Sequence, residues 1–488
     1  MKRRAFIKTI GQTAAAVSLP QLWSACQSTN KQRPNILWIV VEDVSPLMSC
    51  YGYDINPTPN LDRMAKKGVQ FLNTFMPAPV CSPCRSAIIT GMMQTTLGTH
   101  NHHSSRSEGT AIHLPSDVKT LPELFRQAGY FTFNQGKDDY NFWYDRDSLY
   151  AGEYTTHALY GKSGKRNIGW KDRKPDQPFF GQIQLSGGKH IYRENLMDRV
   201  RNRVNRQAFD LPPYYPDHPA VREDWAQHLN SIQITDDEVG EIVVHLRTDG
   251  LLENTIIFFF SDHGMRLWRH KQFCYDSGLH VPFIMSWPGN PQKLGGDGSI
   301  REDLVNGIDI AATSLALAGI EIPDYMENRN LFARVYKRRE HVISARDRCD
   351  YTIDRIRTVR TKRFRYIRNY FLDRAYMQPN YRDAWEITQI MRKLHAQGKL
   401  NAIQDRFWSD ERPQEEFYDL QNDPHEIDNL AGHPKYSDDL IRHREILDDW
   451  ILETDDKGQY PEDAANLKYM FDWWGEKCIN PEYDRFRK

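Results

Sequence analysis

Four short apolar runs recur in the first part of the chain, and polar residues follow each of them. The runs lie at 35–41, 130–133, 179–185 and 256–260. Continuous apolar runs of this length are typical of strands that are buried on both faces of a parallel sheet. Helical patterns separate them, over 121–128, 237–246 and 304–318. The alternation predicts an α/β fold, with a large, mainly parallel sheet flanked by helices.

The polar residues after these runs predict where ligands bind. They are Glu42-Asp43, Gly136-Lys137, Gly187-Gly188-Lys189-His190 and Ser261-Asp262-His263-Gly264. The carboxyl ends of parallel strands meet at one edge of a sheet, where α/β folds bind their ligands. Carboxylates that lie close together repel one another, so Glu42, Asp43 and Asp262 at one edge favour a divalent cation there.

Beyond about residue 340 the pattern changes to arginine-rich alternation, at 355–360 and 364–368. Alternation with period two is typical of half-exposed strands. We therefore expect a main domain over 33–340 and a smaller C-terminal α+β subdomain with an antiparallel sheet over 341–488.

The first 26 residues have the pattern of an export signal. Paired arginines at 3–4 precede a mildly apolar stretch over 9–19, as in a twin-arginine signal, and Ser24-Ala25-Cys26 resembles a lipoprotein cleavage site. The alternative is that the leader is cleaved nearby without a lipid being added to Cys26. The apolar stretch is too short to span a bilayer. We expect export to a bacterial periplasm, with membrane attachment only through a lipid on Cys26.

Composition excludes two classes of protein. The 488 residues include 64 basic and 65 acidic side chains, and a net charge of −1 argues against a nucleic-acid binder. Seven cysteines, scattered singly except at Cys81 and Cys84, do not form a disulfide framework.

Residues 81–91, with the sequence CSPCRSAIITG, combine a cysteine, a cation and the start of a helix. Pro83 suits a first helical turn and Gly91 ends the helix, so Cys81 lies at the positive end of the helix dipole. Arg85 follows one turn later, and the arrangement can receive an anion. The C-x-x-C spacing also fits a redox pair or half a zinc site. A zinc site would need a second pair of ligands, which the singly scattered cysteines do not provide, and the chain is far longer than a redox domain of thioredoxin size.

This segment resembles the C-x-P-x-R-x-x-x-x-T-G signature of type I sulfatases, in the alkaline-phosphatase-like superfamily. Further motifs extend the resemblance in order from Arg33 to about Leu430. It implies that a maturation enzyme converts Cys81 to formylglycine, whose hydrate is the nucleophile in sulfate ester hydrolysis. The catalytic domain is then 33–340.

The resemblance also implies Ca²⁺, with Glu42, Asp43, Asp262, His263 and the modified Cys81 as ligands. The family usually has Asp-Asp where this chain has Glu42-Asp43. The cation would stabilise negative charge as the sulfur is attacked.

Other site residues follow from the same resemblance. Arg85 would hold the hydrated aldehyde, and Lys137 and Lys271 would bind sulfate oxygens, with Arg269 as a rival to Lys271. His190 would protonate the leaving alcohol, which suits a group whose pKa is near neutrality.

The chain departs from the family pattern G-K-x-H at the residue that eliminates sulfate from the diol. Position 139 is aspartate. Asp139 or one of His100, His102 and His103 would be the elimination base, and the sequence does not decide between them.

The expected substrate is a sulfated carbohydrate. The segments 346–350 and 367–370 resemble the heparan-sulfamidase-like branch, and ulvan-like algal polysaccharide and glycosaminoglycan both remain open. Arg193, Arg199 and Arg357 could bind a polyanion. One alternative is a phosphonate or phosphodiester hydrolase of the same superfamily. Another is a non-catalytic glycan-binding lipoprotein, against which the presence of both Cys81 and Arg85 argues.

Overall fold

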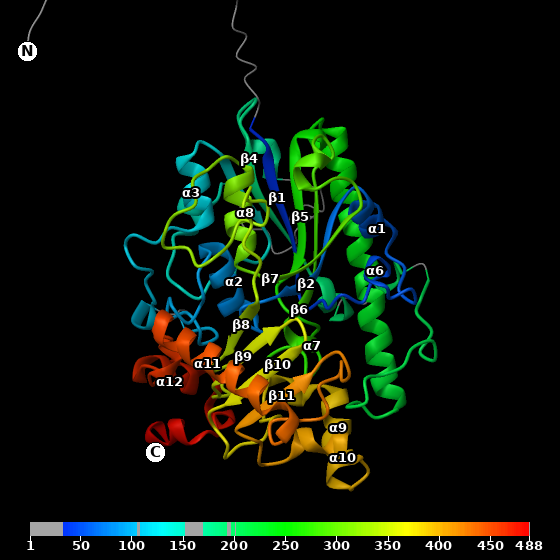
Figure 1. Ribbon diagram of the computed structural model, residues 1–488, viewed down its shortest axis with the longest axis vertical. Coiled ribbons are helices and arrows are strands. Elements are labelled where there is room, and N and C mark those ends of the chain that lie inside the picture. Colours follow the sequence, from blue (N-terminus) through cyan, green and yellow to red (C-terminus); the bar gives the residue numbers. More distant parts are fainter. Residues whose placement is uncertain (1–32, 105–107, 152–168, 193–196, 201, 488) are drawn as a thin grey trace, which may run out of the picture. The chain divides into compact units, whose positions relative to one another are not determined.

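The computed structural model describes residues 33–104, 108–151, 169–192, 197–200 and 202–487. The predicted leader, Cys26 and Arg193 lie outside these residues. Residues Arg33–Lys488 form one compact unit (Figure 1). In the part of the chain that the structure describes, no helix is long and apolar enough to cross a membrane.

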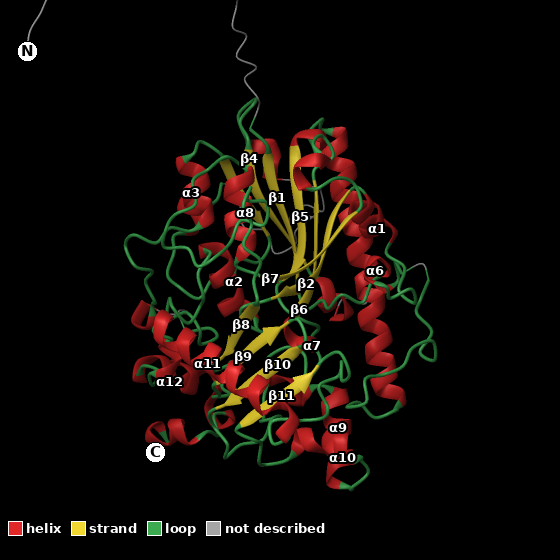
Figure 2. Ribbon diagram, in the orientation of Figure 1, coloured by secondary structure: helices red, strands yellow, loops and turns green. Residues whose placement is uncertain are grey.

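Seven strands form a mixed sheet in the order β3-β4-β1-β5-β6-β2-β7 (Figure 2). Their bounds are Asn35–Val41 for β1, Gly68–Phe75 for β2, Phe131–Gln135 for β3, Phe179–Leu185 for β4, Thr255–Ser261 for β5, His280–Ser286 for β6 and Ser299–Asn306 for β7. Only β6 is antiparallel to its neighbours; the other adjacent pairs are parallel. The predicted mainly parallel sheet is confirmed.

Strand β1 shows why its sequence is apolar at every position. Leu37 and Ile39 belong to a core cluster with residues of α1 and α6, whereas Ile36 and Trp38 belong to a cluster with residues of α2, α3 and α8. Helices therefore cover both faces of the sheet. These helices are α1 Pro59–Lys66, α2 Cys81–Thr90, α3 Leu121–Gln127, α6 Pro219–Thr248 and α8 Asp309–Leu317.

Two helix predictions were wrong at their ends. The helix expected at 237–246 is the C-terminal third of α6, which begins at Pro219 and has 30 residues. The helix expected at 304–318 begins only at Asp309, because residues 304–306 extend β7 and pair with β2. The other α-helices of the described residues are α4 Arg146–Leu149, α7 Asp276–Leu279, α9 Glu386–Ala396, α10 Ala402–Asp405, α11 Ser437–Thr454 and α12 Ala464–Trp474.

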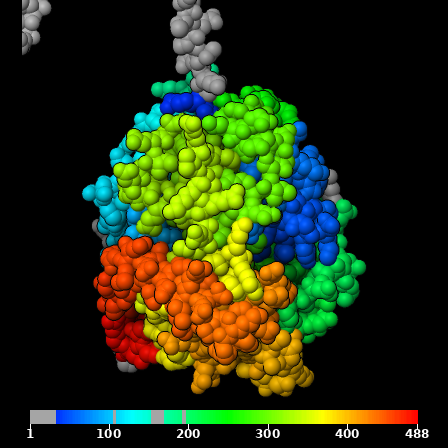
Figure 3. All heavy atoms as spheres, viewed as in Figure 1, coloured from blue at the N-terminus to red at the C-terminus, as the bar shows by residue number. Residues whose placement is uncertain are grey.

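A second sheet of four antiparallel strands has the order β11-β10-β9-β8, which confirms the smaller antiparallel sheet. Its strands are β8 His341–Arg346, β9 Ile356–Thr361, β10 Phe364–Asn369 and β11 Glu415–Asp419. Helix α11 packs against one face, through Leu440 and Leu447. The sheet lies beyond the carboxyl ends of β1 and β5, and residues after about 400, in orange and red, gather around it (Figures 1 and 3).

The alternation predicted half-exposed strands, but Arg357 and Arg365 have 0% exposure. Arg357 donates to Asp456 at 2.7 Å, and Arg365 forms an ion pair with Glu426 at 2.8 Å. The expectation that Arg357 binds a polyanion is therefore wrong, because its guanidinium is used in an internal ion pair.

We predict that Arg357→Met destabilises the protein by about 3–5 kcal/mol, because it leaves Asp456 and Asp347 buried without their cation. Lys468→Met, which breaks an exposed pair with Asp472, is the control and costs about 1 kcal/mol or less. Urea unfolding of both variants measures this. Equal losses would contradict the assigned role of Arg357.

Candidate active site

Cys81 is the first residue of α2, as predicted, and is 4% exposed. Val80 before it is extended, with φ of −151°, and the whole helix is buried. Gly91 ends the helix with φ of 70°, where a Cβ would lie 2.3 Å from the Asn328 side chain. The sulfur therefore lies at the positive end of a fully buried helix.

The ends of β1 and β5 bring two acidic pairs together. These strands are adjacent and parallel, with Val41 opposite Ser261, so Glu42-Asp43 and Asp262-His263 leave the sheet side by side. The backbone N–H of Asp43 donates to Asp262 Oδ1 at 3.2 Å. Asp43 has φ of 57°, a left-handed conformation that is uncommon outside glycine.

The donor atoms here have the spacing of a cation site. His263 Nε2 lies 3.3 Å from Asp43 Oδ1, 3.6 Å from Asp262 Oδ1 and 3.4 Å from Cys81 Sγ. Ligands about 2.4 Å from one ion at right angles are roughly 3.4 Å apart. Two carboxylates, an imidazole and the position of residue 81 therefore fit a divalent cation, with Glu42 beside them.

Each carboxylate also faces a cation of the chain. Arg85 Nε bonds Asp262 Oδ2 at 3.0 Å, and Lys137 Nζ lies 2.9 Å from Glu42 Oε1. Lys271 Nζ bonds Asp43 Oδ1 at 2.8 Å and Cys81 Sγ at 3.3 Å. The structure thus brings together Cys81 and most of the predicted site residues.

These charges control ionisation in the site. Burial opposes ionisation of Asp43, but Lys271, Lys189 and His263 outweigh it and hold the pKa of Asp43 below its usual range. Burial likewise opposes ionisation of Cys81, yet Lys137, Lys271 and Lys189 lower the pKa of its thiol well below the usual value. The site therefore favours an anion at residue 81.

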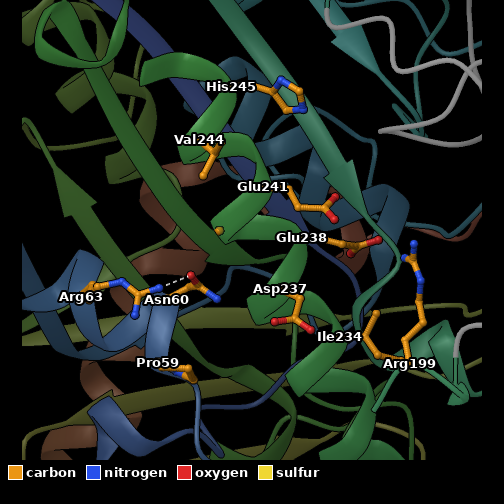
Figure 4. A pocket seen from close by; sticks show the side chains of 11 residues that line it. Pro59, Asn60, Arg63, Arg199, Ile234, Asp237, Glu238, Glu241, Val244 and His245 are labelled. Carbon is orange, nitrogen blue, oxygen red and sulfur yellow. Dashed lines mark hydrogen bonds between the residues drawn. The ribbon is translucent and has the colours of Figure 1, made fainter. Parts of the chain in front are cut away.

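His190 differs from its predicted place. Its side chain is fully buried, and Nε2 lies 3.0 Å from Glu238 Oε2 on α6. Glu238 also lines a separate pocket formed with α1 (Figure 4). With no exposed surface, this ring does not contact a substrate in the observed structure.

Lys189 points to the site instead, and pairs with Glu42. Both residues belong to the 3₁₀ helix Gly187–Tyr192, in which successive side chains point about 120° apart. Neighbouring residues of this helix therefore point in different directions: Lys189 points into the site, and the His190 side chain is buried. Lys189 was part of the polar cluster noted in the sequence, but no role was assigned to it.

The structure separates Lys271 from its rival, Arg269. The Arg269 guanidinium lies over the rings of Tyr214 and Tyr275, at 4.3 and 3.9 Å from their centroids. It donates to the Glu426 carbonyl at 2.6 Å. Lys271 is the residue that contacts Cys81.

The candidate elimination bases lie beside Cys81. A ring nitrogen of His102, Cys81 Sγ and an Asp139 oxygen are all within 4.8 Å of one another. Asp139 lies 3.1 Å from Lys137 Nζ and 3.5 Å from His103 Nε2. His100, by contrast, lines a different cavity.

Asp350, which the sequence did not indicate, orients His102. Its Oδ1 lies 3.1 Å from His102 Nδ1, which leaves Nε2 without a hydrogen-bond partner. Burial lowers the pKa of His102, but Asp350 outweighs this effect and raises it overall. The pKa of Asp139 is held well below its usual value, since Lys137 and the two histidines outweigh its burial.

The family model described as sulfatase matches residues 34–320, more than half of the chain. The chain belongs to the sulfatase family. A second model, N-sulphoglucosamine sulphohydrolase, C-terminal, matches residues 263–411 of this sulfatase. The enzyme is 34% identical over 468 residues to an ulvan-active sulfatase of Formosa agariphila, a match that covers 86% of this chain and 73% of that protein.

Solved structures share its alkaline-phosphatase-like fold. A 2-O GAG sulfatase has a TM-score of 0.62 at 21% identity, covering 89% of this chain and 96% of that chain. The phosphonate monoester hydrolase of Agrobacterium radiobacter has a TM-score of 0.61 at 17% identity, covering 86% and 96%. At these identities the likeness shows the fold alone.

We predict opposite results for the two cysteines of α2. Cys81→Ala should lower sulfate release from an aryl sulfate by about 10³-fold or more, since it removes the side chain that Lys271 and His263 both contact. Cys84→Ser should keep most activity, because Cys84 only donates to the Asp262 carbonyl, at 2.8 Å, and serine can do the same. If Cys84→Ser is as damaging as Cys81→Ala, the nucleophile is misassigned.

Proposed function

We propose that this protein is a calcium-dependent sulfatase that hydrolyses sulfate esters on a polysaccharide or oligosaccharide, with formylglycine formed from Cys81 as the nucleophile. The observation that carries the proposal is the placement of Cys81 at a helix N-terminus, in contact with Lys271 at 3.3 Å and His263 at 3.4 Å. The ulvan-active relative and the match to a sulphohydrolase model support a sulfated carbohydrate, either ulvan-like or glycosaminoglycan.

Four cationic side chains lie where the sulfate group would bind. Lys137, Lys189, Lys271 and Arg85 converge on the carboxylates beside Cys81. One hydroxyl of the hydrated formylglycine attacks the sulfur and gives up its proton, the bond from sulfur to the sugar oxygen breaks, and the sugar oxygen takes up a proton, so that the sugar leaves as an alcohol. These lysines hold the sulfate oxygens, and Lys189 takes the position that we expected for His190. Its raised pKa keeps it a cation.

The carboxylates of Glu42, Asp43 and Asp262, together with His263 and the modified residue 81, would hold calcium. When bound there, the ion supplies positive charge beside the sulfate. The distances of 3.3–3.6 Å from His263 Nε2 to Asp43, Cys81 and Asp262 support this assignment.

His102 is the base that we assign to sulfate elimination. After the ester is cleaved, residue 81 carries the sulfate, and removal of the proton from its second hydroxyl releases the sulfate and restores the aldehyde. Nε2 of His102 is free to accept that proton, and Asp350 stabilises the imidazolium that forms. Asp139 is a weaker base because Lys137 stabilises its ionised form.

The proposal includes two processing steps. A formylglycine-generating enzyme acts on Cys81, and the leader motifs support export to a bacterial periplasm, with Cys26 as the site of a lipid anchor.

The fold shared with a phosphonate monoester hydrolase makes phosphonate and phosphodiester hydrolysis the competing activity. We predict that protein co-produced with a formylglycine-generating enzyme releases sulfate from sulfated oligosaccharides faster than it hydrolyses a phosphodiester. Mass spectrometry of the peptide containing residue 81 should show formylglycine. Chelation of calcium should abolish turnover, and added calcium should restore it.

The matched control is the same protein produced without the maturation enzyme, which should retain the thiol at Cys81 and have little activity. Full activity with an intact thiol would contradict the nucleophile. Unchanged turnover after chelation would contradict the calcium site, and a preference for the phosphodiester would contradict the proposed function.

We predict that His102→Gln slows turnover by about 10²–10⁴-fold and leaves sulfated formylglycine on the protein, because ester cleavage proceeds and elimination stalls. Since His102 must be neutral to accept a proton and its pKa is raised above 6.5, elimination should fall as the pH drops through that pKa. Intact mass measured after a single turnover detects the adduct.

Asp139→Asn is the matched comparison, since both residues lie beside Cys81. Accumulation of the adduct in Asp139→Asn, with normal elimination in His102→Gln, would assign the base to Asp139 instead. Asp350→Asn should cause a smaller accumulation than His102→Gln and shift the acidic limb of the pH profile downward.

A further inference from the structure

A second cavity, of about 720 Å³, shares two chain segments with the active site. In the first segment, His102 lies beside Cys81, whereas His100 lines the cavity. In the second, Asp350 contacts His102, whereas Asp347 lines the cavity. Each of the two segments thus contributes residues both to the active site and to this cavity.

We name it the Arg355 cavity, after its central cation; the residues used here are His100, Asp347, Arg355, Tyr370, Tyr460 and Arg485. His100 and His102 are two residues apart, a span of at most about 7 Å. The part of the cavity wall that His100 forms is therefore within one or two sugar units of residue 81. Its volume is in the range of roughly 300–1,000 Å³ that is typical of ligand pockets.

Most acidic groups of the cavity wall already have partners. Arg348 bonds Glu462 at 2.6 Å, and Arg412 bonds Asp354 at 2.9 Å. Arg374 bonds Glu482 at 3.2 Å. The positive charge of these arginines offsets the negative charge of the carboxylates, so the pairs add little net charge to the cavity.

Arg355 has fewer hydrogen-bond and ion-pair partners than these arginines. Its guanidinium stacks on the Tyr370 ring, 3.8 Å from the centroid, and Nε has no hydrogen-bond partner. It contacts Asp456 only at 3.6 Å, and that carboxylate already accepts two bonds from Arg357, at 2.7 and 2.9 Å. Arg485, which is exposed, makes no ion pair with a described residue. The cavity therefore offers spare positive charge.

Buried polar atoms without partners line the same cavity. His100 is 8% exposed, and its Nδ1 has no partner; the Tyr370 hydroxyl and Asp347 Oδ2 have none either. Burial lowers the pKa of His100, so the ring is neutral. Each such group costs about 1–3 kcal/mol when it is left unsatisfied, a cost that ligand hydroxyls can remove.

We propose that the Arg355 cavity binds an anionic sugar unit of the substrate chain, one or two units from the sulfate that is removed. A planar guanidinium, held flat on Tyr370, is suited to a carboxylate or sulfate group. Tyr460, 54% exposed at the rim, offers an apolar face to a sugar ring. This inference rests on the proposed carbohydrate sulfatase activity and extends it to a second site.

The test compares two substrates in the matured full-length enzyme. Arg355→Gln should lower kcat/KM for a sulfated tetrasaccharide of a uronic-acid-containing polymer by roughly 10- to 100-fold, mainly through KM, because a charge-assisted bond is lost. Turnover of 4-nitrophenyl sulfate, which is too small to reach the cavity, should stay within about twofold. Arg334→Gln, at an exposed arginine away from the cavity, removes the same charge and should change neither.

Binding of the same tetrasaccharide to Cys81→Ala protein, measured by calorimetry, separates this inference from the proposed function. Weaker binding in Cys81→Ala/Arg355→Gln than in Cys81→Ala supports the cavity even if the natural reaction is not sulfate hydrolysis. Equal binding, or an equal loss on both substrates in Arg355→Gln, overturns it. Arg355→Lys, which keeps the charge but not the fork, should restore only part of the affinity.

Discussion

The mutual compensation of charge at the carboxyl ends of β1 and β5 is the interaction on which the rest of the site depends. Glu42, Asp43 and Asp262 are buried side by side, and such carboxylates remain ionised only next to positive charge. Lys137, Lys189, Lys271 and Arg85 supply it from four different segments. The fold therefore has to bring distant segments together before any of these charges is stable.

The second sheet contributes to this arrangement in a similar way. Its buried arginines pair with carboxylates from other parts of the chain, as Arg365 does with Asp276 in α7. Through Asp350 the region after β8 also reaches His102 next to Cys81. Ion pairs that lack solvent thus fix the small sheet against the edge where the chemistry takes place.

Local patterns predicted the elements that have a local cause. The bounds of β1 and β4 and the start of α2 at Cys81 were correct, because burial on both faces and helix-start preferences act over a few residues. β2 and β7 were not predicted, since polar residues interrupt their apolar positions, and β6 contains Pro282, which argues against a strand inside a sheet. The buried arginines of β9 and β10 imitate an exposed face, and only distant carboxylates reveal their burial.

The prediction of site residues has the same limit, because local motifs are visible in the sequence and contacts between distant segments are not. Cys81, Arg85 and the acidic pairs lie in short motifs, and the structure brings them together. Lys189 and His190 differ by one position, which a sequence pattern does not resolve in a 3₁₀ helix. Asp350 is 248 residues from His102, so no local signal connects them.

The burial of α2 has a consequence for the order of events in the life of the chain. Cys81 is 4% exposed and every residue of its helix is buried. A modifying enzyme that needs an extended stretch of backbone around this cysteine has no access to it in the folded protein. If Cys81 is converted as we propose, the modification therefore has to precede the folding of α2, and a molecule that folds first keeps its thiol. The order of modification and folding would then decide which molecules become active.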